Sequence, residues 1–386
     1  MTRSDPERPA ATRSRPLPCL PTAATPLINP SEFRRIVSGQ RRDWRAVGSR
    51  CLLGVCAVPY RWAVQWRNRG YDSRRRSVTA VEVPVISVGN LTLGGTGKTP
   101  MVEWLCQWFR AQHVRVCILS RGYHAVDGGA NDEAWELEEK LPEVPHLQNP
   151  DRVAAARVAI DELATQVIVL DDGFQHRRLQ RTLDIVLLDA LEPFGFEHVF
   201  PRGTLREPLT GLRRADVIGL TRADMLDEGQ RRAIRARVAS YNPQAIWLEL
   251  VHQPCALRQA TGENHALPSA GDRLRVAAFC GIGNPDGFRH SLHASGFEIA
   301  AFREFPDHHH FSREDVQSLI HWANELPNVE AVLCTHKDLV KIGIDLLGQK
   351  KLFALTVEMR IDYGKDRLES RLREIARTAI AADGED

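Results

Sequence analysis

The segment "SVGNLTLGGTGKTPMVEWL" (87–105) has the residue types of a phosphate-binding loop, placed between a predicted strand and a predicted helix. Its end matches the pattern G-x-x-x-x-G-K-[ST] at Gly97, Lys98 and Thr99, but Thr92 stands where the pattern has its first glycine. That glycine only helps the chain leave the strand. The alternative is a glycine-rich turn that happens to precede a lysine, and the flanking strand and helix favour a nucleotide site.

The residue types in this loop each suit a bound nucleotide. Glycines allow backbone N–H groups to surround a phosphate where a Cβ atom would clash. The lysine places a positive charge near the β- and γ-phosphates, and the threonine hydroxyl is a suitable Mg²⁺ ligand. The sequence therefore predicts that the nucleotide is held by Gly94, Gly95, Gly97, Lys98 and Thr99.

The segment "VIVLDDGFQHRRL" (167–179) has the form of a Walker B strand, in which a carboxylate at the end of an apolar strand holds Mg²⁺. Asp171 and Asp172 are the candidate carboxylates. Acidic residues at strand ends are also common as loop caps, so the segment alone would be a weak signal. With a phosphate-binding loop about 70 residues upstream, it favours a site for a magnesium nucleotide.

Two further segments carry weaker signals. "GLTRAD" (219–224) loosely resembles the [NT]-K-x-D guanine-reading motif of GTPases, but Arg222 replaces the lysine, so a strand followed by a helix cap at Asp224 is favoured. In "FPDHHHFSRED" (305–315), three adjacent histidines cannot all converge on one metal ion. One of them could act as a general base beside an acid partner, and the segment by itself leaves this open.

Apolar segments of strand length alternate with helical patterns from residue 81 onwards. In the helix predicted after the glycine-rich loop, Val102, Leu105, Cys106 and Phe109 share one face. Apolar strands separated by helices are typical of a mainly parallel sheet with helices on both faces, so we predict a P-loop NTPase-like α/β fold. The predicted strands are 81–90, 114–120, 167–172, 184–190, 216–221, 245–250, 275–283, 330–338 and 351–359, and helices are predicted at 98–112 and 151–165.

The alternation of strands and helices breaks at residues 251–271, a stretch rich in polar residues, glycine and proline. It then resumes, and we predict a boundary near residue 252 with a second, smaller α/β domain beyond it. The predicted parts are a Pro-rich disordered tail (1–32), a basic amphipathic arm (33–76), a P-loop domain (77–252), a linker (253–272) and the smaller α/β domain (273–386).

Charge is distributed unevenly along the 386 residues, although the formal net charge is only +2. Residues 34–76 hold twelve arginines against two aspartates, a balance of +10, which leaves −8 for the rest of the chain. Such a basic segment suits an anionic surface, either lipid headgroups or nucleic acid. The eight cysteines are scattered without a C-x-x-C pair, which argues against a disulfide scaffold or a zinc site and fits a reducing cytosol.

The basic arm (33–76) mixes arginines, tryptophans and small apolar residues at helical intervals, interrupted at Pro59. It is either a solvated helical arm packed on its own domain or an interfacial pair of helices with Trp44, Trp62 and Trp66 at headgroup level. Its longest apolar run is about half of the roughly 20 residues that a membrane-spanning helix needs. The first thirty residues contain seven prolines, so we expect neither a signal peptide nor a helix there.

Taken together, a series of motifs in the chain resembles the tetraacyldisaccharide 4′-kinase family, in the same order and from about residue 33 to 340. That family uses ATP to phosphorylate a tetraacylated glucosamine disaccharide 1-phosphate in lipid A biosynthesis, and its loop also has a threonine at the position of Thr92. The resemblance implies a kinase that depends on ATP and Mg²⁺, peripheral on the cytoplasmic face of the inner membrane, with the basic arm resting on the lipid. The motifs are "SVGNLTLGGTGKTP", "SRGY", "NDEA", "DDGFQHRRL", "PRGTLREPL", "FCGIGNPDGF", "FPDHHHFS" and "THKD".

The resemblance also implies roles for residues around the nucleotide. Thr96, Lys98 and Thr99 would contact the phosphates and Mg²⁺, and Asp171 and Asp172 would fill the Walker B position. Positioning, Mg²⁺ and the charge of the lysine would do most of the catalytic work. On the nucleotide and metal side it further implies Arg206 for the nucleotide and Gln175 and Glu207 for the metal.

On the acceptor side, the resemblance implies that Arg121 and His176 contact the lipid substrate. Asp132 matches the general base that takes the proton of the sugar 4′-hydroxyl, and His308 matches its histidine partner. Catalysis would therefore rest on these two residues together with Lys98.

Two residues depart from the family pattern: Asn131 stands where a glycine is usual, and His336 replaces a glutamate in "THKD". The alternative from another class is a GTPase-like chaperone or regulatory switch, which would prefer GTP through residues 219–224 and need no lipid. Nucleic-acid binding by the arm is less favoured, because its tryptophans and aliphatic residues suit a lipid boundary and no other segment resembles a nucleic-acid module. The sequence points to no protein partner.

Overall fold

The computed structural model describes residues 30–122, 132–269, 273–307 and 309–383. Apolar strands and capped helices alternate along these residues, as the sequence predicts. The strands are β1 Val85–Asn90, β2 Val116–Ser120, β3 His146–Gln148, β4 Val167–Asp171, β5 Leu183–Asp189, β6 Val217–Thr221, β7 Ile246–Arg258, β8 Asn264–His265, β9 Leu274–Cys280, β10 Phe297–Glu304, β11 Ala331–Thr335, β12 Leu346–Leu347 and β13 Lys350–Tyr363. The helices are α1 Pro30–Val37, α2 Trp44–Asp72, α3 Lys98–Ala111, α4 Asp132–Lys140, α5 Arg152–Asp161, α6 Glu228–Tyr241, α7 Pro285–Ala294, α8 Arg313–Glu325, α9 His336–Ile342 and α10 Lys365–Asp383.

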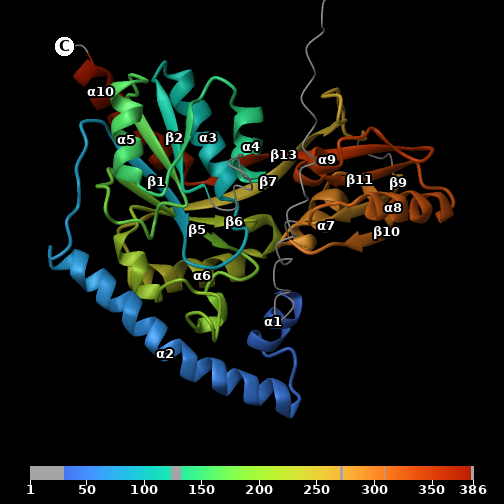
Figure 1. Ribbon diagram of the computed structural model, residues 1–386, viewed down its shortest axis with the longest axis horizontal. Helices are drawn as coiled ribbons and strands as arrows, with labels where there is room; N and C mark the ends of the chain where they lie inside the picture. Colours follow the sequence, from blue (N-terminus) through green and yellow to red (C-terminus); the bar gives the residue numbers. More distant parts are fainter. Residues whose placement is uncertain (1–29, 123–131, 270–272, 308, 384–386) are drawn as a thin grey trace, which may run out of the picture.

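The described strands join into one sheet in the order β10-β9-β11-β13-β7-β6-β5-β1-β4-β2-β3, with β12 beside β13 and β8 beside β7. Neighbouring strands from β3 to β7 are parallel, and so are β10, β9, β11 and β13. The predicted P-loop NTPase-like α/β fold, with a mainly parallel sheet and helices on both faces, is confirmed. The sheet carries two lobes, seen side by side in Figure 1.

The first lobe comprises strands β1 to β6, the start of β7, and the helices on their two faces. Alternate residues of each strand point to opposite sides, so each face has its own apolar cluster. Helices α3, α4 and α10 pack on one face, and α5 and α6 cover the other. Phe109 and Leu105 of α3 are completely buried, which stabilises the lobe by about 2 kcal/mol for each side chain.

The second lobe comprises β8 to β12 with the start of β13, and it repeats this arrangement on a smaller scale. Helices α8 and α9 pack on one face of its strands and α7 on the other. The turns into these helices are fixed by side-chain caps: Ser312 accepts a hydrogen bond from the Asp315 N–H, and Asn284 accepts one from Gly287. Capped turns therefore follow the carboxyl ends of β9 and β10, on the side of the second lobe that faces the first lobe.

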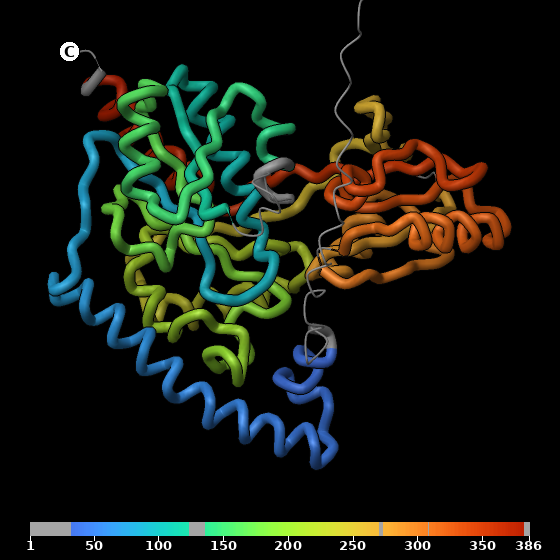
Figure 2. The backbone as a smooth tube through the Cα atoms, viewed as in Figure 1, coloured from blue at the N-terminus to red at the C-terminus, as the bar shows by residue number. Residues whose placement is uncertain are grey.

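The two lobes are joined by the long strands β7 and β13, which pair antiparallel from Ala354 beside Arg258 to Tyr363 beside Glu249. Strand β7 runs through residue 252 without a break, and the chain returns along β13 to the first lobe, where α10 packs in the same cluster as α3. Figure 2 lets the reader follow this return of the red segment. The predicted domain boundary near residue 252 stays a prediction. Any such boundary has to allow for β7 and β13, the two strands that run from one lobe into the other.

The basic arm forms two helices, and the predicted interruption at Pro59 is wrong. Helix α2 is continuous through Pro59, and the break lies instead at residues 38–43, where Gly39 has a φ of 79°. A proline removes one backbone hydrogen bond, and the remaining bonds of a 29-residue helix keep it intact. Ala57 and Val64 of α2 are buried, whereas Trp44, Trp62 and Trp66 are 78, 72 and 73% exposed. None of the described helices has both the length and the apolar character needed to cross a membrane.

Candidate active site

The glycine-rich loop connects the end of β1 to the start of α3 at the carboxyl edge of the parallel strands. Gly94 and Gly97 have φ values of 116° and 77°, a left-handed backbone that favours glycine. The Arg222 guanidinium donates a 2.8 Å hydrogen bond to the Gly95 carbonyl and so helps to fix the conformation of the loop. The predicted residues Gly94, Gly95, Thr96, Gly97, Lys98 and Thr99 all line one cavity of about 1000 Å³ between the two lobes.

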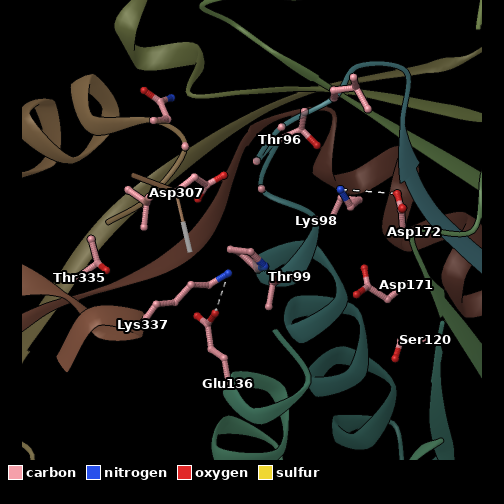
Figure 3. Close-up of a pocket in the computed structure, with 18 of the residues that line it drawn as sticks. Thr96, Lys98, Thr99, Ser120, Glu136, Asp171, Asp172, Asp307, Thr335 and Lys337 are labelled. Carbon is pink, nitrogen blue, oxygen red and sulfur yellow. Dashed lines mark ion pairs between the residues drawn. The ribbon is translucent and has the colours of Figure 1, made fainter. Parts of the chain in front are cut away.

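Thr96 and Thr99 lie where bound phosphates would need polar partners. Both are buried, and the Thr96 hydroxyl has no hydrogen-bond partner among the described residues. A buried, unsatisfied hydroxyl costs free energy unless a ligand completes it. Figure 3 shows both side chains on the loop and first turn of α3, beside Lys98. The loop therefore has the geometry of a phosphate-binding cradle.

The predicted Walker B residues, Asp171 and Asp172, lie next to this loop because β4 pairs with β1, with Asp171 in register with Val88. Lys98 Nζ lies 3.6 Å from Asp172 Oδ1, and Arg206 Nη1 donates to both oxygens of the same carboxylate at 2.7 and 2.9 Å. Burial alone would raise the pKa of Asp172, but the charges of Lys98 and Arg206 outweigh it and lower the pKa. Asp172 is thus held as a carboxylate at the edge of the cavity.

The residues around Asp172 fit a magnesium ion. Thr99 and Asp171 are buried at the cavity wall, and Asp172 and Gln175 also line it, giving the oxygen ligands that Mg²⁺ prefers. The described residues contain no group of three or more His, Cys, Asp or Glu side chains arranged as a metal cluster. Such a cluster is not needed, because Mg²⁺ in nucleotide sites takes one or two protein carboxylates and completes its shell with phosphates and water.

Gln175 and Glu207 are hydrogen-bonded to each other, but only Gln175 lines the cavity. Gln175 Nε2 donates to the Asn90 carbonyl at 2.8 Å and to Glu207 Oε1 at 3.2 Å, while Gln175 still lines the cavity. Glu207 is completely buried and does not line it. Its carboxylate also accepts from Arg214 at 3.0 Å and from Asn68 of α2 at 2.9 Å. Its predicted metal role stays a prediction.

The predicted substrate residues Arg121 and His176 line the same cavity on the side of β2 and β4. Burial, reinforced by the charges of Arg152 and Arg178, lowers the pKa of His176 to about 4. Its Nε2 atom is buried without a hydrogen-bond partner among the described residues. At neutral pH, His176 is therefore an uncharged group available for hydrogen bonding.

Of the predicted general base and its histidine partner, only Asp132 lies within the described residues. Asp132 is the first residue of α4, and His308 lies outside the described residues. The neighbours of His308 differ in their surroundings: Asp307 lines the cavity, whereas His309 Nε2 pairs with Asp315 at 3.0 Å and stacks on Phe305. The pairing of Asp132 with His308 stays a prediction.

Comparison with known proteins adds the decisive observation. Residues 49–377 match the family model described as tetraacyldisaccharide-1-P 4′-kinase. The chain belongs to the tetraacyldisaccharide 4′-kinase family. It is 38% identical over 339 residues to the tetraacyldisaccharide 4′-kinase of Anaeromyxobacter sp. (strain K), covering 83% of this chain and 89% of the relative.

Two further members of the family are similar to this chain, one compared by sequence and one by structure. The tetraacyldisaccharide 4′-kinase of Syntrophus aciditrophicus (strain SB) is 37% identical over 355 residues, covering 83% of this chain and 94% of the relative. The crystal structure described as the "apo" form of LpxK from Aquifex aeolicus in complex with ATP superimposes with a TM-score of 0.65 at 30% identity. It covers 84% of this chain and 99% of that one, so both lobes are shared.

In this member of the tetraacyldisaccharide 4′-kinase family, helix α4 ties the two lobes together. Glu136 lies 3.4 Å from Lys337 in α9, and Glu139 pairs with Arg258 at 2.6 Å and with His336 at 3.5 Å. Burial would raise the pKa of Glu136, but Lys337 and Lys140 together lower it. Figure 3 shows the pair of Glu136 and Lys337 across the cavity from Lys98 and Asp172. His336, which departs from the usual family residue, thus has an acidic partner.

Two arginines at the site were missed from the sequence. In the sequence Arg222 is only a poor match to a guanine-reading motif, yet it donates to the Gly95 carbonyl and pairs with Asp189 at 2.9 Å. Arg152 is 2% exposed and lines the cavity beside Asp171, and burial lowers its pKa to about 10. The only available signal was an arginine directly after the helix cap Asp151, a pattern that many surface helices share.

Proposed function

We propose that this chain, a member of the tetraacyldisaccharide 4′-kinase family, performs its ATP-dependent step of lipid A biosynthesis in the cavity between the lobes. The acceptor is the 4′-hydroxyl of tetraacyldisaccharide 1-phosphate. The observation that carries the proposal is that one cavity joins a phosphate cradle to a wall of buried, polar side chains around His176 and Arg152. A nucleotide switch without an acceptor would need no such second wall.

On the nucleotide side, the loop from Gly94 to Thr99 binds the phosphates through backbone N–H groups. Lys98 sits beside Asp172 and neutralises the charge that develops as the γ-phosphoryl group moves. Thr99, Asp171, Asp172 and Gln175 are the residues that would hold Mg²⁺, which when bound supplies electrostatic stabilisation of the phosphate oxygens. Arg206 keeps Asp172 ionised and oriented.

On the acceptor side, Asp132 is the proposed general base, with His308 as its partner. The base takes the proton from the 4′-hydroxyl oxygen, that oxygen bonds to the γ-phosphorus, and ADP leaves. Arg121 and the uncharged His176 orient the sugar by hydrogen bonds. Alignment of the hydroxyl with the γ-phosphate contributes much of the rate acceleration.

We further propose that the basic arm seats the enzyme on the cytoplasmic face of the inner membrane. The exposed tryptophans Trp44, Trp62 and Trp66 suit the headgroup region, and the arginines between them suit anionic phosphates. An acylated acceptor cannot leave the bilayer without a large hydrophobic cost, so the kinase has to work at its surface.

The test is transfer of radiolabelled phosphate from ATP to tetraacyldisaccharide 1-phosphate in mixed micelles. We expect labelled lipid from the wild type and at least a hundredfold less from Asp132→Ala, with ATP binding retained. Glu138→Gln, at an exposed carboxylate of the same helix α4, is the control and should remain active. Nucleotide hydrolysis without labelled lipid in the wild type would contradict the proposal.

A further inference from the structure

The arm helix α2 does more than lie along the first lobe: its inward face reaches the segment that contacts Asp172. The Tyr60 hydroxyl donates a 2.9 Å hydrogen bond to the Arg206 carbonyl. Two turns further along the same helix, Asn68 Nδ2 donates a 2.9 Å bond to the Glu207 carboxylate. The two neighbouring residues 206 and 207 are therefore both held from α2.

Glu207 is the centre of this arrangement. Its buried carboxylate accepts hydrogen bonds from three parts of the chain: Asn68 in α2, Gln175 after β4, and Arg214 in the 3-10 helix Leu209–Arg214. A buried carboxylate is tolerated only when its oxygens are fully satisfied. We therefore expect that loss of one donor would shift the other two, because the carboxylate charge attracts them.

Gln175 links Glu207 to the phosphate loop. The same Nε2 group that donates to Glu207 also donates to the Asn90 carbonyl, at the last residue of β1 before the loop begins. On the other side of Glu207, Arg177 donates to the Asn68 carbonyl at 3.1 Å and pairs with Asp72 at 2.7 Å, which fixes this end of α2. A continuous path of hydrogen bonds thus runs from the arm to the nucleotide site.

We propose that Asn68 is a positioning residue for phosphoryl transfer, acting through Glu207 on Gln175 and the start of the phosphate loop. The seating of α2 on the first lobe then sets the geometry of the nucleotide site, so the arm and the site work as one unit. The role of Gln175 beside the nucleotide rests on the proposed function, whereas the contacts from α2 do not.

The first experiment compares Asn68→Ala with Gln65→Ala in the full-length protein. Gln65 is an amide on the same helix whose side chain makes no hydrogen bond within the described part of the chain. We expect Asn68→Ala to lower kcat about tenfold and to weaken binding of a fluorescent ATP analogue severalfold in the presence of Mg²⁺, while sedimentation with anionic phospholipid vesicles is unchanged. Gln65→Ala should change none of these. Unchanged nucleotide binding and kcat in Asn68→Ala would overturn the proposal.

The second experiment separates positioning from a general loss of stability. In a Gln175→Ala background, removal of Asn68 should cost less than twofold in kcat, because the path from the arm is already broken. An equal loss in both backgrounds would show that Asn68 acts by another route and overturn the proposal. If Asn68→Ala fails to fold, Asn68→Ser keeps a polar side chain without a second charge but shortens the reach to Glu207, and it should weaken analogue binding more than Gln65→Ala.

Binding of the fluorescent ATP analogue tests this inference separately from the proposed function. If the wild type fails to phosphorylate the lipid, the proposed acceptor is wrong. The effect of Asn68 on binding of the magnesium nucleotide can still be measured, and its absence there overturns the positioning role alone.

Discussion

The two walls of the cavity are built in different ways. The first-lobe wall follows adjacent parallel strands, so the register of β1 and β4 places Asp171 beside the phosphate loop through the backbone alone. The second-lobe wall, with Asp307, Thr335 and Lys337, reaches the first lobe through side-chain ion pairs to α4 and along β7 and β13. We therefore expect changes in the first wall to affect chemistry and changes in the second wall to affect affinity.

The largest effect is expected in the first wall, at Lys98. Lys98→Ala removes a positive charge from the phosphates and from Asp172, so we expect kcat to fall by about 10³-fold. Steady-state phosphorylation of the lipid in micelles measures this loss. Lys351→Ala, at an exposed lysine of β13, is the control and should keep wild-type kcat. A loss smaller than tenfold at Lys98 would contradict the role given to the first wall.

The next largest effect also lies in the first wall and concerns the backbone of the phosphate loop. A Cβ atom at Gly97 would lie 3.0 Å from His252 Nε2 on a left-handed backbone, whereas one at Gly95 would meet nothing within 4 Å. We expect Gly97→Ala to lower the free energy of unfolding by about 2 kcal/mol and Gly95→Ala by less than about 0.5 kcal/mol. Urea unfolding of both variants measures the difference, and equal stabilities would count against the predicted strain.

A third test uses the pH dependence at the junction of the two walls. Burial, with the charges of Arg222 and Lys140, lowers the pKa of His252 to about 3, so below about pH 6.5 the unfolded chain binds a proton that the folded chain does not. Stability from this group is therefore present above about pH 6.5 and is lost as the pH falls towards 3. Between pH 6.5 and pH 5 an unscreened shift of this size would remove ~2 kcal/mol of stability, and because the ring is only half-buried we expect a loss of about 1 kcal/mol at pH 5.

The measurement for His252 is the free energy of unfolding in urea at pH 7 and pH 5. His252→Asn removes the titrating ring, so its stability should fall less over this range than that of the wild type. His321→Asn, at an exposed histidine of α8, is the control and should follow the wild type. An equal fall in the free energy of unfolding for wild type and His252→Asn would show that His252 does not contribute to the pH dependence.

The smallest effect is expected in the second wall. Glu136→Gln breaks the pair with Lys337 that joins α4 to α9, so we expect the KM for ATP to rise about threefold while kcat changes less than twofold. Glu138→Gln, at an exposed glutamate of the same helix, is the control. A fall in kcat with unchanged KM would contradict the expectation that the second wall affects affinity and not chemistry.

The first wall could be predicted from the sequence because its residues are contiguous and their spacing is fixed by a strand, a turn and a helix. Gly94 to Thr99 and the pair Asp171 and Asp172 are of this kind. Arg222 and the partners of α4 could not be predicted, because Glu136 and Lys337 meet only after two hundred residues have folded. The error at Pro59 has a different cause: a local rule about proline was overridden by the length of the helix and its packing.

The return of the chain along β13 has a consequence for synthesis on the ribosome. Leu368 and Leu372 of α10 are completely buried in the cluster that contains Phe109 of α3, so the hydrophobic interior of the first lobe is closed by residues that are translated after the second lobe. Many multidomain chains complete one domain before the next emerges. Here the phosphate loop is made early, yet the lobe around it reaches its final stability only after translation of the entire second lobe.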